Sequence, residues 1–299
     1  MELPDVVCLG ETMILVTPTE PSALEDAQLF YLTVGGAEST VAMYLAEFGH
    51  NTAWTSVVGT DPLGTRLIQT LAAQGVDTSY VVFTDDAPTG VYFKNPGEAS
   101  TSVHYYRKGS AASTMAVGFL EALPLATAHL VHTSGITAGL SVSCRDLMLA
   151  IPGQLRGTPT KLSFDVNYRP GVWSVREAAE VLLGIARQAD YVFVGLDEAA
   201  VLWQTTTPQS IYDLIGPVGK VIVKDGAVGA TEFSVDGEFF VPAPKIHVVE
   251  EVGAGDAFAA GYLTVQLTGG TSLDSLQSGH RLAARTLQST SDFVPRERV

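Results

Sequence analysis

Basic residues are scarce in this sequence. Its 299 residues include 17 Lys and Arg against 32 Asp and Glu, which gives a formal net charge of −15. Binding to the phosphate backbone of nucleic acid or to an anionic membrane needs a basic face, so we expect neither partner. A small anionic substrate stays compatible with this charge, because a few cationic groups and backbone N–H groups can reverse the potential inside a cleft.

Cysteines and long apolar runs are also scarce. The only two cysteines, Cys8 and Cys144, are too few for a disulfide framework, and we expect packed thiols in a reducing compartment. No apolar run reaches the roughly 20 residues of a membrane span. The N-terminus carries Glu2 and Asp5 instead of the basic stretch of a signal peptide. These features predict a cytoplasmic protein.

Short apolar strands alternate with amphipathic helices along most of the chain. We predict strands at residues 6–9, 52–58, 128–132, 161–165, 191–194 and 221–224. We predict helices between them at residues 40–48, 64–74, 142–151, 175–189 and 199–204. This alternation indicates an α/β fold in which helices cover both faces of a mostly parallel sheet, as one large domain or two smaller ones. Ligands of such sheets bind beyond the carboxyl ends of the strands.

Two segments break this alternation. Residues 12–34 have strand-like ends, and residues 88–110 show alternating apolar and aromatic side chains. We expect them to form a small β-sheet that acts as a lid over the cleft. Strand periodicity places Tyr105 and Arg107 on one face of this sheet and His104 on the other. The alternative for residues 88–110 is an ordinary edge hairpin with a solvated arginine.

The motif Gly253-Ala254-Gly255-Asp256 precedes an apolar run that we predict to be a buried helix ending near Leu267. Glycines at a helix entrance let backbone N–H groups converge on an anion, and the helix dipole adds partial positive charge there. A carboxylate in the first turn can take a proton from an incoming hydroxyl. Phosphoryl transfer to an alcohol needs this combination. A glycine-rich turn with a capping aspartate is the alternative that the motif alone leaves open.

Four segments, at residues 35–42, 58–64, 224–229 and 253–258, read GGAESTVA, VGTDPLG, KDGAVG and GAGDAF. In this order they resemble the GGAxxNVA, VGxDxxG, KxGxxG and GAGDxF motifs of the ribokinase-like (PfkB) carbohydrate kinases, and the resemblance covers nearly the whole chain. It implies one ribokinase-like domain over residues 1–299, a three-layer α/β/α fold with a small β-sheet lid, and phosphoryl transfer from ATP with Mg2+.

The resemblance also implies roles for individual residues. Asp256 would be the catalytic base, and the turn formed by Gly253, Ala254 and Gly255 would stabilise the transferring phosphoryl group. The other matched residues would bind the sugar (Gly35, Gly36 and Thr40), the nucleotide (Lys224, Gly226 and Gly229) and, through water, Mg2+ (Glu198).

Two further segments resemble the 2-keto-3-deoxygluconate kinases within this family: YYRKGSAAS at residues 105–113 and FDVNYRP at residues 164–170. These enzymes phosphorylate the terminal hydroxyl of a six-carbon sugar acid. A planar guanidinium binds a carboxylate through two hydrogen bonds, so Arg107 and Arg169 are expected to converge on the carboxylate of the substrate. By the same resemblance, Tyr92 and Tyr105 would pack against the sugar or form hydrogen bonds with it.

Three departures from the family motifs bear on the substrate. Thr40 replaces the asparagine of GGAxxNVA, an amide that commonly touches sugar hydroxyls. Gly195 replaces the asparagine of an NxxE motif whose glutamate is Glu198. Residues 250–252, EEV, replace a lead-in of the DTT or DPV type.

Two alternatives to a sugar-acid kinase remain open at this point. One is a kinase of a neutral substrate such as fructose, ribose or a nucleoside, and the placement of Arg107 and Arg169 distinguishes it. The other is a sugar- or nucleotide-sensing protein without turnover, against which the intact Asp256 argues. The open strand edges of the lid predict a homo-oligomer. A dependence on monovalent cations is left open by the sequence.

Overall fold

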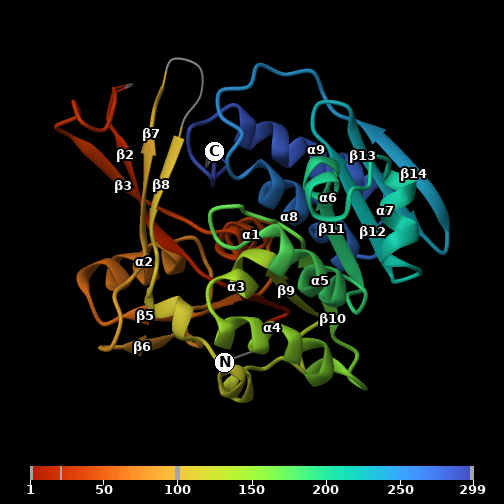
Figure 1. The fold of residues 1–299 in the computed structure, drawn as a ribbon, viewed down its shortest axis with the longest axis horizontal. Coiled ribbons are helices and arrows are strands. Elements are labelled where there is room, and N and C mark those ends of the chain that lie inside the picture. The colour runs from red at the N-terminus through yellow and green to blue at the C-terminus, as the bar shows by residue number, and fades with distance from the viewer. Residues whose placement is uncertain (1–2, 21, 98–101, 297–299) are drawn as a thin grey trace.

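The largest element of the fold is an eight-stranded sheet in the order β14-β13-β12-β11-β10-β9-β1-β4 (Figure 1). The computed structural model describes residues 3–20, 22–97 and 102–296. Six strands pair in parallel: β4 (Thr52–Thr55), β1 (Val6–Leu9), β9 (Leu130–Ser134), β10 (Lys161–Asp165), β11 (Tyr191–Gly195) and β12 (Lys220–Asp225). The last two strands form an antiparallel hairpin at one edge: β13 (Gly229–Ser234) and β14 (Gly237–Pro242).

Helices cover both faces of this sheet, as predicted. Alternating strand residues separate the two cores: Val7 and Leu9 face one, and Val6 and Cys8 face the other. The first core is closed by α3 (Gly135–Gly139), α4 (Val142–Leu155), α5 (Val175–Ala186), α6 (Leu196–Trp203), α7 (Pro208–Ile215) and the short helices η1 (Ala111–Thr114) and η2 (Val117–Ala122). The second is closed by α1 (Ala37–Glu47), α2 (Pro62–Ala73), α8 (Ala254–Leu267) and α9 (Ser272–Leu287). The three-layer α/β/α prediction is confirmed.

The lid is a separate four-stranded sheet in the order β3-β2-β7-β8, upright at the left of Figure 1. Its strands come from the two predicted segments: β2 (Met13–Pro18), β3 (Phe30–Gly35), β7 (Val91–Asn95) and β8 (Ser102–Tyr106). The segments meet where β2 pairs in parallel with β7. Residues 21 and 98–101 of the predicted lid lie outside the described residues. Among the described residues, no helix has the length and apolar character to cross a membrane.

One predicted strand is divided in two. The segment predicted at residues 52–58 forms β4 in the main sheet and then β5 (Val57–Gly59), which leaves that sheet to pair with β6 (Val82–Thr84). The break at Ser56 therefore directs the chain away from the edge of the sheet. The hairpin of β13 and β14 and helices α7 and α9 were not among the predicted elements.

Helices α8 and α9 pack closely through small residues. As a glycine inside a helix, Gly261 is expected to accept alanine. The structure contradicts this expectation, because a Cβ on Gly261 would lie 2.6 Å from the Ser278 carbonyl oxygen and 3.1 Å from the Gly279 Cα. These are backbone atoms, which cannot rotate away, so the two helices would have to separate.

We expect Gly261→Ala to lower the free energy of unfolding by about 1–3 kcal/mol, the usual scale of overpacking. Gly184→Ala in α5 is the matched control, since nothing lies within 4 Å of the position of its Cβ. The control should raise stability by about 0.5–1 kcal/mol, because alanine loses less backbone entropy than glycine in a helix. Urea unfolding of both variants gives the comparison, and a stabilised Gly261→Ala would contradict the packing seen here.

Candidate active site

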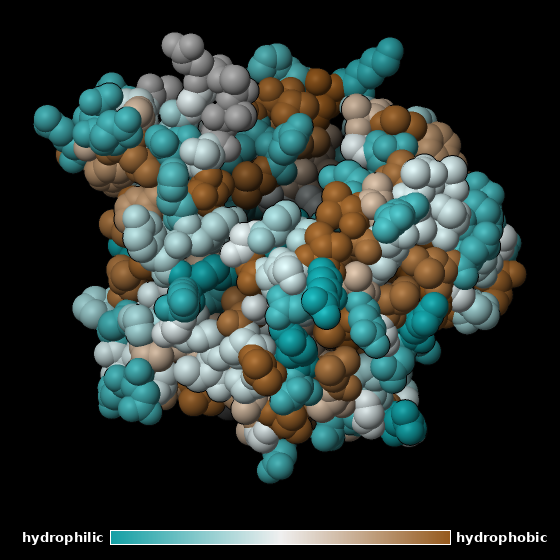
Figure 2. Space-filling model, in the orientation of Figure 1, coloured by the Kyte–Doolittle hydropathy of each residue, from teal (hydrophilic) through white to brown (hydrophobic). Residues whose placement is uncertain are grey.

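A cavity of about 980 Å³ lies beyond the carboxyl ends of the parallel strands. Asp165 at the end of β10, Gly195 at the end of β11 and Lys224 near the end of β12 form part of its wall. The lid contributes Tyr92 and Tyr105 from the opposite side. Figure 2 shows the molecule hollowed between the lid and the main body, with apolar side chains on part of the rim. The cavity therefore lies where this sheet topology predicts a ligand.

The turn before α8 forms one end of the cavity. Gly253 is the N-cap residue, with a φ of 82° that favours glycine, and a Cβ there would lie 2.8 Å from the carbonyl oxygen of Asp292. Beyond it, a Cβ on Gly255 would meet only the Lys224 Nζ, at 3.4 Å. The N–H groups in the first turn of a helix have no carbonyl earlier in the helix to bind. In α8, the Ala254 N–H donates instead to the Glu251 carbonyl oxygen, which precedes the helix, over 3.3 Å. This end of the cavity is therefore suited to an anion.

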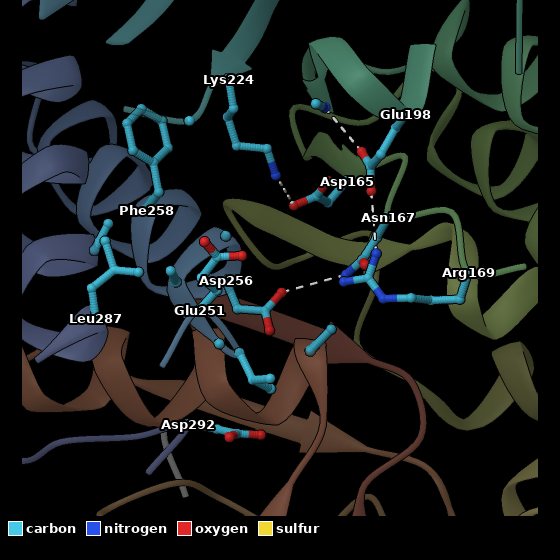
Figure 3. A pocket seen from close by; sticks show the side chains of 18 of the residues that line it. Asp165, Asn167, Arg169, Glu198, Lys224, Glu251, Asp256, Phe258, Leu287 and Asp292 are labelled. Atoms are coloured by element: carbon cyan, nitrogen blue, oxygen red, sulfur yellow. Dashed lines mark hydrogen bonds and ion pairs between the residues drawn. The ribbon is translucent and has the colours of Figure 1, made fainter. Parts of the chain in front are cut away.

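Asp256 lies in this first turn and lines the cavity, where the Asn167 Nδ2 donates to its Oδ1 over 3.4 Å (Figure 3). Burial and then the charge of Asp165 raise the pKa of Asp256 to about 7, against the lowering effects of Arg169 and Lys224. A carboxyl group with this pKa exchanges its proton readily near neutral pH, which suits a general base.

Lys224 faces Asp256 across the end of the sheet and pairs with Asp165, Nζ to Oδ2, at 2.8 Å. Burial alone would lower the pKa of the Lys224 ammonium, but Asp165 and then Glu198 raise it above its usual value. The other oxygen of Asp165, Oδ1, is buried with no hydrogen-bond partner among the described residues. It is a free acceptor beside the cavity.

Glu198 lies in the first turn of α6, where its Oε2 accepts a hydrogen bond of 2.9 Å from Gly195 N. Burial raises the pKa of its carboxyl. Within the described ranges, no group of three or more His, Cys, Asp or Glu side chains is arranged to hold a metal directly. The free oxygen of Asp165 and the carboxylate of Glu198 nevertheless fit a hydrated Mg2+, which keeps several of its waters and needs few protein ligands.

The two arginines both line the cavity, but each already has a carboxylate partner. Arg107 pairs with Glu11, which is only 1% exposed, and its guanidinium lies 5.5 Å from the centre of the Tyr105 ring. Arg169 pairs with Glu198, Nη1 to Oε1, at 3.3 Å (Figure 3). The sequence predicted neither pairing, because nothing in the chain order brings these residues together.

Thr40 does not contribute to the cavity wall. It lies in α1 with 1% of its surface exposed, and its hydroxyl has no hydrogen-bond partner among the described residues. This placement contradicts the predicted contact between Thr40 and the substrate. The asparagine it replaces is longer, so the shorter threonine stays inside the helix packing.

Gly35 and Gly36, which the resemblance assigns to the sugar, line the cavity. A Cβ on Gly35 would lie 1.7 Å from the Tyr92 Oη, and one on Gly36 would lie 2.5 Å from the Glu11 carbonyl oxygen. Both glycines therefore make room for neighbouring protein atoms. The Tyr92 hydroxyl, predicted to face the sugar, donates to Asp292 Oδ2 at 2.8 Å, while its ring stacks on Tyr105.

The other end of the cavity is largely apolar. Gly226 and Gly229 lie there with φ of 46° and 151°, and a Cβ on Gly229 would lie 2.4 Å from the Val241 carbonyl oxygen. The apolar wall beside them suits a flat ring system and consists of Val201, Ala227, Ile246, Val248, Ala283 and Leu287. In Figure 3, Lys224 points toward Asp165, above Asp256.

A helix start suited to an anion, beside a carboxyl group of raised pKa, fits a phosphotransferase. The chain matches the model of the pfkB family of carbohydrate kinases over residues 3–297 and belongs to that family.

Similar proteins support this assignment. The chain is 34% identical to a 2-dehydro-3-deoxygluconokinase of Bacillus subtilis, over 97% of this chain and 91% of that one. The crystal structure of a PfkB protein from Polaromonas sp. superposes with a TM-score of 0.89 at 32% identity, covering 96% of this chain and 97% of that one. An uncharacterized sugar kinase from Pyrococcus horikoshii in complex with ATP has a TM-score of 0.82 at 25% identity, over 96% and 94%.

The sequence assigned no role to several residues that the structure brings to the site. They are carboxylates and an amide: Glu11, Glu38, Asp165, Asn167 and Asp292. Both Asp165 and Asn167 lie in the FDVNYRP segment. Asp165 ends the strand predicted at residues 161–165 and Asn167 follows it, so the rule that ligands bind at strand ends was a signal for both.

The raised pKa of Asp256 predicts a cost in stability. Its carboxyl is protonated in the folded protein at pH values where the unfolded chain has lost the proton, so stability falls as the pH rises from about 4 to about 7. We expect Asp256→Asn to raise the melting temperature at pH 8, with a gain that disappears toward pH 4. Asp146→Asn, at an exposed position of α4, is the control. A gain independent of pH would contradict the electrostatic cause.

Proposed function

We propose that this carbohydrate kinase transfers the γ-phosphoryl group of ATP to the terminal hydroxyl of 2-keto-3-deoxygluconate, giving the 6-phosphate. The observation that carries the proposal is the first turn of α8, where an anion site and the carboxyl of Asp256 share the end of one cavity. The similarity to the Bacillus subtilis 2-dehydro-3-deoxygluconokinase supports this substrate.

Asp256 acts as the general base in this proposal. With a pKa of about 7, a large fraction of Asp256 side chains is ionised at neutral pH. The carboxylate is nevertheless basic enough to accept a proton from an alcohol. The N–H groups of the first turn, with the dipole of α8, stabilise the charge on the phosphoryl group as it transfers.

The nucleotide lies toward the apolar end of the cavity. The adenine ring packs against the wall that includes Ala227 and Leu287, and the ammonium of Lys224 interacts with the phosphates. Gly226 and Gly229 shape the turn beside it. Asp165 and Glu198 would hold a Mg2+ ion through water, and the ion would supply positive charge that neutralises the phosphates of ATP.

Arg107 and Arg169 recognise the carboxylate of the sugar acid. Both guanidinium groups are in the cavity wall, one at the end of the lid and one after β10. Charged hydrogen bonds of this kind are stronger than neutral ones and tie the planar group in one orientation. Tyr105 and the stacked Tyr92 give the sugar an aromatic surface. A neutral sugar would offer neither arginine a second charged partner beside Glu11 and Glu198.

The lid also supports a proposal on assembly. Its described surface carries large exposed apolar side chains, Tyr31 at 61% and Tyr106 at 69% exposed. We propose that residues 1–299 form one domain whose lid, about residues 12–34 and 88–110, joins two copies.

The two cysteines are buried free thiols, in keeping with a cytoplasmic location.

The base assignment predicts the pH dependence of catalysis. Below an apparent pKa of about 7, the logarithm of kcat/KM should fall by one for each pH unit, since Asp256 must be ionised to accept a proton. Asp256→Asn should lower kcat by roughly 100-fold or more and leave ATP affinity unchanged. Rates measured from pH 5 to 9 test both points. Wild-type turnover in folded Asp256→Asn would rule out this base.

The substrate assignment predicts the effect of removing the arginines. Arg107→Ala and Arg169→Ala should each raise the KM for 2-keto-3-deoxygluconate about 10- to 100-fold, the equivalent of one charged hydrogen bond of about 1.5–3 kcal/mol. Wild type should strongly prefer the sugar acid to an analogue with the carboxylate reduced to an alcohol, and the variants much less so.

A panel with the galacto epimer, fructose and ribose completes this test. Equal kcat/KM for the acid and its reduced analogue in wild type would favour the neutral-sugar kinase. Binding of sugars without any phosphorylated product would favour the sensor.

A further inference from the structure

A buried lysine, Lys94, connects the lid to the start of α8. It lies in β7 with 1% of its surface exposed, although lysine is almost never fully buried unless it is paired. It does not line the cavity described above, and none of the motifs in the sequence includes it. A charge removed from water in this way needs compensation by nearby oxygens.

The Lys94 ammonium has three oxygen partners from two segments far away in the sequence. It donates to the Thr290 carbonyl oxygen at 2.8 Å and to Asp292 Oδ1 at 2.9 Å, and it forms an ion pair of 2.9 Å with Glu250 Oε1. Two of these oxygens accept hydrogen bonds from the ammonium, and Glu250 Oε1 is held by charge at ion-pair distance. Figure 1 shows the C-terminal end of the chain beside the lid, where these contacts are made.

Two of these oxygens belong to residues that fix the turn before α8. Glu250 lies three residues before Gly253, in a segment whose Val249 N–H donates to the Leu287 carbonyl oxygen at 2.7 Å. Asp292 packs directly on Gly253, since a Cβ there would lie 2.8–3.1 Å from three of its atoms. The position of the turn thus depends on Glu250 and Asp292, the two partners of Lys94 that contribute carboxylates.

Tyr92 adds a second tie on the same face of β7. Residues two apart in a strand point the same way, and the Tyr92 hydroxyl donates to the other oxygen of Asp292, Oδ2, at 2.8 Å. Asp292 is therefore held by the lid through both carboxylate oxygens. Its side chain is 6% exposed, so solvent competes little for these bonds.

We propose that Lys94 is a positioning residue for phosphoryl transfer: its ammonium clamps the lid strand β7 to Glu250 and Asp292 and so holds the N–H groups of the first turn of α8 in place. The inference rests on the proposed function, because it assigns the clamp to the same anion site. Lys94 touches neither substrate, and it acts through the turn at Gly253.

Loss of the ammonium leaves two carboxylates facing each other in a buried, oxygen-lined space. Repulsion displaces the turn in Lys94→Met, and loss of the tie between β7 and Glu250 displaces it in both Lys94→Met and Lys94→Met/Glu250→Gln. A displacement of about 1 Å at a reacting centre costs on the order of 100-fold in rate. Lys94→Met keeps the length of the chain without the charge. Because this variant can unfold, Lys94→Met/Glu250→Gln is made beside it, which leaves Asp292 as a single carboxylate still bound by Tyr92.

The experiment compares kcat and KM of wild type, both Lys94 variants and Lys161→Met, below the melting temperature of each. Lys161 is the matched control, an exposed lysine whose Nζ pairs with Asp190 at 2.8 Å far from the cavity. We expect kcat of both Lys94 variants to fall about 10- to 100-fold with little change in the KM for ATP. The control should keep the wild-type kcat.

A second readout separates positioning from a role in stability alone. In Lys94→Ala, ammonium or potassium ions added to the assay should enter the oxygen-lined space and restore part of kcat, whereas tetramethylammonium is too large to do so. Wild type should show no such response. Restoration by the small cations alone supports the clamp.

Failure of this inference is distinguishable from failure of the proposed function. If wild type phosphorylates a sugar and the folded Lys94→Met/Glu250→Gln variant keeps the wild-type kcat, the clamp is overturned and the kinase assignment stands. An equal effect of all chloride salts on Lys94→Ala also overturns it. If wild type forms no phosphorylated product from any sugar, the proposed function fails and the inference fails with it.

Discussion

The left-handed turn at Gly253 is the constraint on which the rest of the site depends. It directs the first turn of α8 into the cavity. The turn is possible because residue 253 is a glycine, and the absence of a Cβ also leaves the space that Asp292 fills. Helix α8 is fixed further along by Gly261, whose Cα faces the backbone of α9. The lid is tied to the same Asp292 through Tyr92. One backbone conformation thus sets the anion site, the carboxyl of Asp256 and the attachment of the lid.

Negative charge around Asp256 is the second determinant of the chemistry. Burial raises the pKa of Asp256 most, Asp165 raises it further and Glu38 adds a smaller effect, against the lowering effects of Arg169 and Lys224. The outcome is a carboxyl group that titrates in the range where a base is useful and that costs folding stability there. Loss of folding stability is common at functional sites. Surroundings that stabilised the fold best would hold the Asp256 carboxyl in a single charge state.

Sequence patterns correctly predicted the structural features that depend on residues close together along the chain. Strand periodicity is confirmed in the lid, where Tyr105 lines the cavity and His104 faces away. The hairpin of β13 and β14 was missed although Asp236-Gly237 is a strong turn signal. Thr40 and Gly261 were misjudged because their surroundings come from packing between distant segments. Pairings over 90 residues or more, such as Arg107 with Glu11, leave no local pattern to recognise.

The ion pairs of Arg107 with Glu11 and of Arg169 with Glu198 affect which anions can bind in the cavity. A bare guanidinium attracts inorganic phosphate, sulfate and chloride without distinction. Arg107 and Arg169 are instead paired with Glu11 and Glu198. In the proposed function, an anion that binds these arginines would therefore compete with carboxylates that the fold already holds in place. Such competition would favour an anion that makes further contacts through the rest of its own molecule.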